Sequence, residues 1–114
     1  MELDRFTIAL LTRPADGPQP DEAAAAALQD AHLGYLAHLH ETGALLAAGP
    51  VAGDRLRGLS ILGVEPERAL ALKRQDPAVR AGLYAVEALQ WRVPAGAVRF
   101  GPARFPRSAA EATR

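Results

Sequence analysis

Residues 30–50, DAHLGYLAHLHETGALLAAGP, combine the second half of a helix, a stop signal and a buried strand. Apolar residues recur every three or four positions as far as Leu39, which is the spacing of one face of an α-helix. Gly43 is the residue type on which helices commonly end, and the apolar run 44–48 has the length of a buried strand. The stretch therefore predicts a long helix that leads directly into a β-sheet.

The residues on both sides of this stretch extend the pattern. The expected strands are residues 5–12, 44–48, 56–64 and 83–93, and the expected helices are residues 21–42 and 65–75, followed by a short helical turn from Asp76 to Gly82. The resulting order is β-α-β-β-α-β, which is the ferredoxin-like arrangement of a four-stranded antiparallel sheet with two helices on one face. We expect this α+β domain to occupy residues 1–94, with residues 95–114 forming a C-terminal extension.

Both faces of the expected sheet are apolar. In the first strand Phe6, Ile8 and Leu10 point to one side, while Ala9 and Leu11 point to the other. An antiparallel sheet with one solvated face would show polar residues on that face. We therefore expect a second copy of the chain to cover the free face about a two-fold axis, giving a homodimer packed sheet to sheet.

Composition narrows the possible functions of the 114-residue chain. Its 13 basic and 13 acidic residues cancel, which argues against nucleic acid or a membrane surface as a partner. The chain has no cysteine, so thiolate catalysis, disulfides and cysteine-based zinc sites are excluded. No His/Asp/Glu set has the spacing of metal ligands, and the N-terminus lacks the pattern of a signal peptide. We expect a cytoplasmic protein without a metal or cofactor.

A histidine lies in the middle of the apolar helix stripe. His32 shares this stripe with Leu36 and Leu39, whereas His38 and His40 flank it and are expected on the surface. Two interpretations of His32 remain open. It is either a core histidine whose ring nitrogens find hydrogen-bond partners, or an acid–base group that projects into a cavity, for which the imidazole pKa of about 6.5 is well suited.

A histidine that acts as a base needs a carboxylate to fix its tautomer and orientation, and Asp76 is the leading candidate. Asp76 precedes Pro77, which also makes it a natural N-cap of the short helical turn. The two roles are compatible, because a capping carboxylate is held in place and has a second oxygen. Glu87, on an apolar strand face, is an outside candidate for the same role.

Several segments of the chain resemble the YciI-like (YCII-related) family, from the first strand to Trp91. The resemblance is carried by AHLGYLAHLHETGALLAAGP, RGLSILGV and KRQDPAVRAGLYAVEALQW, and within them by His32-Leu33 with Leu36, Ala48-Gly49-Pro50, Gly58 and the run from Asp76 to Tyr84. The family implies the β-α-β-β-α-β fold, a dimeric α+β barrel formed sheet to sheet, and a pocket with a His–Asp pair. By position that pair is His32 and Asp76.

Two departures from the family pattern prevent transfer of a substrate. Leu59 stands where many relatives have serine, with Ser60 following on the opposite strand face, and Ala78 stands where many have an aromatic residue.

We expect a small cofactor-independent enzyme that performs isomerisation, elimination or proton transfer on a small anionic or aromatic molecule. His32 would be its acid or base and Asp76 would orient it. The expected substrate-binding residues are Tyr35, Gly49, Pro50, Gly58, Ser60 and Tyr84. A ligand-binding module without catalysis, or a dimerisation domain, is the alternative.

Overall fold

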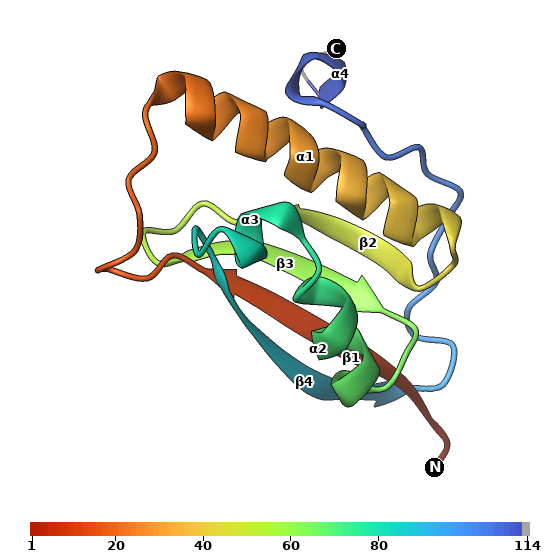
Figure 1. The fold of residues 1–114 in the computed structure, drawn as a ribbon. Helices are drawn as coiled ribbons and strands as arrows, with labels where there is room; N and C mark the ends of the chain where they lie inside the picture. The colour runs from red at the N-terminus through yellow and green to blue at the C-terminus, as the bar shows by residue number, and fades with distance from the viewer. Residues whose placement is uncertain (113–114) are drawn as a thin grey trace.

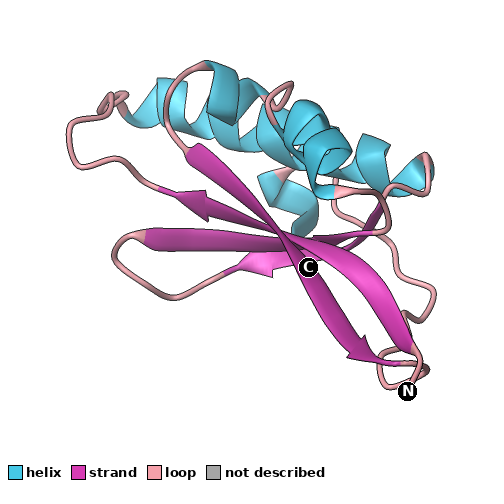
Figure 2. Ribbon diagram, turned by 90° about the horizontal axis from the view of Figure 1, so that it is seen from below, coloured by secondary structure: helices cyan, strands magenta, loops and turns pink. Residues whose placement is uncertain are grey.

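The computed structural model describes residues 1–112 and has the expected order of strands and long helices. The elements are β1 (Leu3–Thr12), α1 (Glu22–Glu41), β2 (Leu45–Pro50), β3 (Leu56–Leu62), α2 (Pro66–Lys73), α3 (Pro77–Arg80), β4 (Ala85–Pro94) and α4 (Ala109–Ala112). The strands form one antiparallel sheet in the order β2-β3-β1-β4, consistent with a ferredoxin-like topology. Helices α1, α2 and α3 lie on one face of this sheet (Figures 1 and 2).

Local signals set the ends of the longest helix. The Asp21 side chain accepts a hydrogen bond from the Ala24 N–H at 2.8 Å, which satisfies one of the free donors at the start of α1. After the helix, Gly43 adopts φ +88°, a left-handed conformation that other residues rarely adopt. The chain can therefore reverse within a few residues and enter β2.

The core lies between the helices α1 and α2 and one face of the sheet. On β1, Thr7, Ala9 and Leu11 are buried beneath the helices and alternate with less buried residues on the other face. The main cluster of buried apolar residues consists of Ala9, Leu36, Leu39, Leu45, Leu62 and Ala69. These small and medium side chains allow α1 to lie close to the sheet, which places the residues of its inner face directly above β2 and β3.

In the described part of the chain no helix lies over the other face of the sheet (Figure 2). Apolar residues of β1 and β4 lie on this face. Phe6, Ile8 and Leu10 on β1 are opposite Trp91, Leu89 and Glu87 on β4. The Phe6 and Trp91 rings have their centres 6.1 Å apart, and Leu89 is 46% exposed. The predicted apolar patterning of both faces is thus present in the sheet.

Several strand boundaries differ from the sequence expectation by one or two residues, and β1 begins at Leu3 and β3 ends at Leu62, each two residues earlier than expected. β2 continues through Gly49 and Pro50 instead of stopping before them, because β2 is an edge strand and proline is tolerated at an edge. β4 begins at Ala85, two residues later than expected. The N–H groups of Leu83 and Tyr84 instead bond the Ala78 carbonyl at 3.0 and 3.4 Å, so they complete the end of α3.

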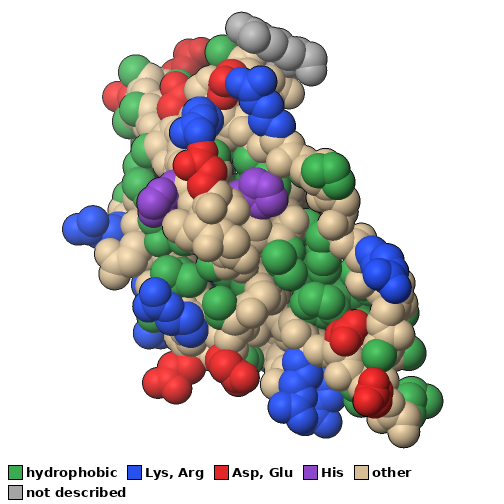
Figure 3. Space-filling model, turned by 90° about the vertical axis from the view of Figure 1, so that its right-hand side faces the viewer, with side chains coloured by type: hydrophobic (Ala, Val, Ile, Leu, Met, Phe, Trp, Pro, Cys, Tyr) green, Lys and Arg blue, Asp and Glu red, His purple; other side chains and the backbone are tan. Residues whose placement is uncertain are grey.

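The segment after β4 returns along the molecule to α1 (Figure 1). Phe100 packs edge-on against Phe6, with ring centres 5.3 Å apart, and α4 then lies beside α1. Charged groups of both signs are interspersed on the end of the molecule shown in Figure 3. Within residues 1–112, no helix has the length and apolar character required to cross a bilayer.

Candidate functional site

The structure brings His32 and Asp76 together although 44 residues separate them. His32 projects from the buried face of α1, and Asp76 lies between α2 and α3. The distance from His32 Nδ1 to Asp76 Oδ2 is 2.6 Å. Asp76 is fully buried, while the His32 side chain keeps 11% of its surface exposed. The two residues therefore form a short hydrogen-bonded pair of which only the imidazole is accessible.

Asp76 makes both of the contacts considered from the sequence. Its Oδ1 accepts a hydrogen bond from the Ala78 N–H at 2.9 Å, with Pro77 in the first turn of α3, while Oδ2 accepts from His32. Because an ionised carboxylate only accepts hydrogen bonds, the proton of a neutral imidazole is placed on Nδ1. This leaves the Nε2 lone pair of His32 available, and no residue within the described part of the chain bonds to Nε2.

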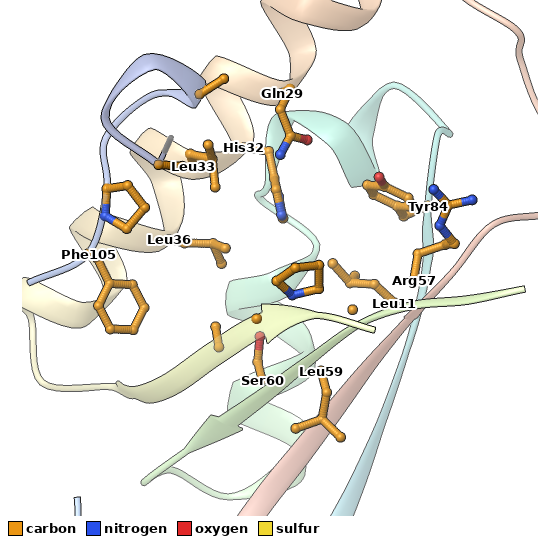
Figure 4. A pocket seen from close by; sticks show the side chains of 17 residues that line it. Leu11, Gln29, His32, Leu33, Leu36, Arg57, Leu59, Ser60, Tyr84 and Phe105 are labelled. Atoms are coloured by element: carbon orange, nitrogen blue, oxygen red, sulfur yellow. The ribbon is translucent and has the colours of Figure 1, made fainter. Parts of the chain in front are cut away.

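His32 projects into a cavity of about 330 Å³ between α1 and the sheet (Figure 4). The walls come from α1, β1, β2, β3, the segment before β4 and the C-terminal extension. Most lining residues are apolar: Leu11, Leu33, Leu36, Ala48, Pro50, Leu59, Phe105, Pro106, Ala109 and Ala112. A Cβ atom at Gly58 would lie 3.4 Å from the Leu11 side chain, at the near limit of ordinary van der Waals contact.

Most of the expected binding residues border this cavity. Gly49, Pro50, Gly58, Ser60 and Tyr84 all line it, and the Tyr84 ring centre lies 6.0 Å from that of His32. Leu59, the first departure from the family pattern, has its side chain pointing away from the cavity, while the neighbouring Ser60 points toward it (Figure 4). Ala78, the second departure, is buried and is not among the described residues that line the cavity.

Tyr35 is the exception among the expected binding residues. It is absent from the described residues that line the cavity, and its hydroxyl donates to the Leu72 carbonyl at 2.5 Å. Burial, and then the negative charge of Asp76, raise the pKa of Tyr35 above its usual value of 10.0. Its hydroxyl thus joins α1 to α2 instead of facing a ligand. Glu87, the outside candidate, is opposite Leu10 on the helix-free face of the sheet and so cannot contact His32.

Comparison with known protein families agrees with this architecture. The family model of the YCII-related domain matches residues 8–92 of the chain. The chain belongs to the YCII-related family. His32, Asp76 and Ser60 lie within the matched segment, whereas the C-terminal extension lies beyond it. No curated protein matched the chain.

The C-terminal extension of this YCII-related protein forms one wall of the cavity. Phe105, Pro106, Ala109 and Ala112 line the cavity from that side. The extension is fixed to α1 by the Ala109 N–H, which donates to Asp30 Oδ1 at 2.9 Å, and by an ion pair between Arg107 and Glu41. The sequence predicts a C-terminal extension at residues 95–114, and a contribution of this extension to the cavity wall was not predicted.

His40 anchors the extension, whereas His38 is exposed as expected. The two His40 ring nitrogens lie 2.8 Å from the Leu45 carbonyl oxygen and 3.1 Å from the Ala103 carbonyl oxygen. The His40 ring also stacks on Phe105, with centres 4.1 Å apart. The expectation of a plain surface position for His40 was therefore wrong, because helix geometry alone does not reveal a later segment that packs over that side.

A buried lysine lies beside the site and was not anticipated. Lys73, at the end of α2, has no exposed surface, and its Nζ donates to Ser60 Oγ at 3.0 Å. Burial lowers the pKa of Lys73 from 10.5 to about 8, and the negative charge of Asp76 opposes this shift. Lys73 lies within the helix expected at residues 65–75, and its burial was not predicted. The available signal was its spacing of four residues from Ala69, which places both on one helix face.

The site does not present a metal-ligand set. Across residues 1–112, no group of three or more histidine, cysteine, aspartate or glutamate side chains is arranged to hold a metal ion. The chemical groups at the cavity are the His32 imidazole with its carboxylate partner, the Ser60 hydroxyl with its amine partner, and the phenol of Tyr84. This set can accept a proton and donate hydrogen bonds to a bound molecule.

Proposed function

We propose that this YCII-related protein is an acid–base enzyme in which Nε2 of His32 takes a proton from a small molecule bound in the cavity. The observation that carries the proposal is the 2.6 Å contact between His32 Nδ1 and a fully buried Asp76 at the edge of a cavity of about 330 Å³. Asp76 fixes the tautomer that presents a basic nitrogen and stabilises the imidazolium formed when His32 accepts a proton.

The walls of the cavity indicate the size and character of the substrate. A volume of about 330 Å³ lies at the small end of ligand pockets, and the mostly apolar lining favours a molecule with an aromatic or aliphatic body. Isomerisation and elimination both begin with removal of a proton from carbon, so both are within the chemistry of a histidine base. We therefore propose a small carbon acid, such as a carbonyl compound, as the substrate.

The test is exchange of substrate C–H for deuterium in D₂O, followed by proton NMR, with phenylpyruvate as the first probe of a panel of small carbonyl acids. Wild-type protein should accelerate the exchange, and His32→Ala should lose about 10²–10⁴-fold of that acceleration. His38→Ala is the matched control, because His38 is an exposed histidine on the same helix. The proposal would be refuted if wild-type protein and His32→Ala gave equal exchange rates for every compound whose exchange the wild-type protein accelerates.

A second candidate function is ligand binding without catalysis, which the apolar wall supplied by the C-terminal extension favours. In that case the His–Asp pair would anchor a ligand by hydrogen bonding alone. The same NMR experiment separates the two, because a compound that binds wild-type protein and not His32→Ala, with no exchange of its C–H groups, supports the binding module.

We also propose that two copies associate through the helix-free face of the sheet, as in a dimeric α+β barrel. Support comes from the half-buried Phe6, Ile8 and Leu10 and from the exposed Leu89, which form an apolar surface on that face. Apolar patches of this kind are typical of protein–protein interfaces. A closed dimer would bury this surface on the side of the sheet opposite the cavity.

A further inference from the structure

The chain has a single lysine, and that lysine is fully buried. Twelve basic positions carry arginine, and Lys73 alone carries an amine. An amine is a compact charge that shifts its pKa when buried, whereas a guanidinium stays charged and requires a planar set of acceptors. Within residues 1–112, Ser60 Oγ is the hydrogen-bond acceptor for Lys73 Nζ. Burying a cation whose hydrogen-bond acceptor is a neutral hydroxyl destabilises the folded protein. The presence of such a cation beside a cavity therefore suggests a function.

Ser60 connects this amine to the cavity. On β3, Ser60 shares the helix-facing side with Gly58, while Leu59 faces the opposite way. Its hydroxyl points up toward the space below the His32 ring (Figure 4). When the Lys73 ammonium donates to Ser60 Oγ, that oxygen accepts, and the hydroxyl hydrogen is left free to be donated to a molecule in the cavity.

We propose that Ser60, oriented by Lys73, is the oxyanion-binding element of the cavity and that the substrate is a carbonyl compound. The inference rests on the proposed function, in which His32 is the base. His32 Nε2 takes a proton from the carbon next to the carbonyl, the electrons of the C–H bond form a carbon–carbon double bond, and the carbonyl π electrons move onto oxygen. The Ser60 hydroxyl donates to that enolate oxygen, and the nearby ammonium stabilises its charge. Ser60 is a binding residue, and Lys73 is a positioning residue.

The charges around the cavity agree with an anionic ligand. None of the described residues that line it is acidic, and Asp76 lies behind His32 outside the lining. Burial lowers the pKa of Lys73 to about 8, so the amine is still mostly protonated at neutral pH. Arg57, exposed at the margin of the cavity, is a second cation that an anion can reach. Preorganised donors aimed at developing negative charge are a strong source of catalysis.

The experiment compares binding of benzoate with binding of benzyl alcohol, which has a similar body and no charge. Titrations followed by NMR at neutral pH use wild-type protein, Ser60→Ala, Lys73→Met and the control Thr7→Val. Thr7 is a buried hydroxyl on β1 that donates to the Val64 carbonyl away from this cavity. Ser60→Ala and Lys73→Met should each weaken benzoate binding about tenfold and change benzyl alcohol binding less than about twofold. Thr7→Val should bind both probes as wild type does.

A merely structural role for Lys73 would weaken both probes equally, and that outcome overturns the inference. It is also overturned if wild-type protein shows no preference for benzoate, or if Arg57→Gln removes the preference while Ser60→Ala keeps it. If Lys73→Met does not fold, the binding of the two probes to Ser60→Ala alone tests the inference. Because benzoate binding requires no turnover, loss of the preference in Ser60→Ala without any isotope exchange supports the anion site while rejecting the His32 base.

Discussion

Replacing Lys73 with methionine should leave the protein at least as stable as wild type at neutral pH and remove part of the pH dependence of its stability. Methionine has nearly the length of lysine and no charge, and the site it would fill has no exposed surface. Burial lowers the pKa of Lys73 from 10.5 to about 8. If the unfolded chain keeps the ordinary value, a pKa difference of this size means that folding destabilises the charged amine by about 3 kcal/mol relative to the neutral amine.

The direction of the pH effect follows from the two pKa values of Lys73. The folded value of about 8 lies below the unfolded value, so between them the unfolded chain binds more protons. The free energy of unfolding of wild-type protein should therefore rise with pH, by about 2 kcal/mol between about pH 7 and pH 9.5 from this group alone. The raised pKa of Tyr35 acts in the opposite direction only near and above pH 10.0, outside this range.

At neutral pH two terms compete in the Lys73→Met variant. Removing the buried charge gains about 3 kcal/mol, whereas the lost hydrogen bond to Ser60 and the burial of an unpaired hydroxyl cost about 1–3 kcal/mol. Near pH 7 the free energy of unfolding of the variant should therefore equal that of wild-type protein or exceed it by up to about 2 kcal/mol. Relative to wild-type protein, the free energy of unfolding of the variant should fall by about 2 kcal/mol toward pH 9.5.

Urea unfolding at several pH values measures both quantities for wild-type protein and variant. Taking the difference between the two proteins at each pH cancels the titration of all shared groups. Arg74→Met is the matched control, because Arg74 is the adjacent exposed cation, and this variant should keep the wild-type pH dependence. Parallel stability curves for wild-type protein and Lys73→Met would refute the burial of a charged amine at this position.

Three further predictions test the site, the cavity wall and the sheet face. Asp76→Asn should lower isotope exchange in the phenylpyruvate assay toward the level of His32→Ala. The melting temperature of this variant should also fall, because a buried carboxylate that accepts hydrogen bonds from two partners is lost. Unchanged exchange would show that His32 does not depend on Asp76 to act as a base. Phe105→Ala should raise amide hydrogen exchange in residues 103–112 and leave β1 protected, since the stack on His40 holds the extension; equal protection in both proteins would contradict this anchor. Leu89→Glu should convert a dimer to a monomer in light scattering, and an unchanged mass would exclude the helix-free face as the interface.

More of the fold than of the candidate site could be predicted from the sequence. The boundaries of α1 were accessible because its acidic cap, its apolar spacing and Gly43 are all local signals. Asp76 was the leading candidate partner of His32 from the residues, and the family resemblance implied the same pair. Spacing alone cannot show that two residues 44 positions apart meet. Tyr35 was misplaced for the complementary reason. Its helix face was identified correctly, but whether a side chain on that face meets a ligand or the Leu72 carbonyl depends on where α2 lies.

By itself, the sequence determined the alternation of strands and helices, the two apolar faces of the sheet and the helix face that carries His32, because each of these depends on residues close together in the chain. The tertiary structure alone decided that Lys73 is buried against Ser60 and that the extension around Phe105 closes one side of the cavity. Periodicity specifies which side of an element avoids water, and only the packing of separate elements specifies which side chains meet there.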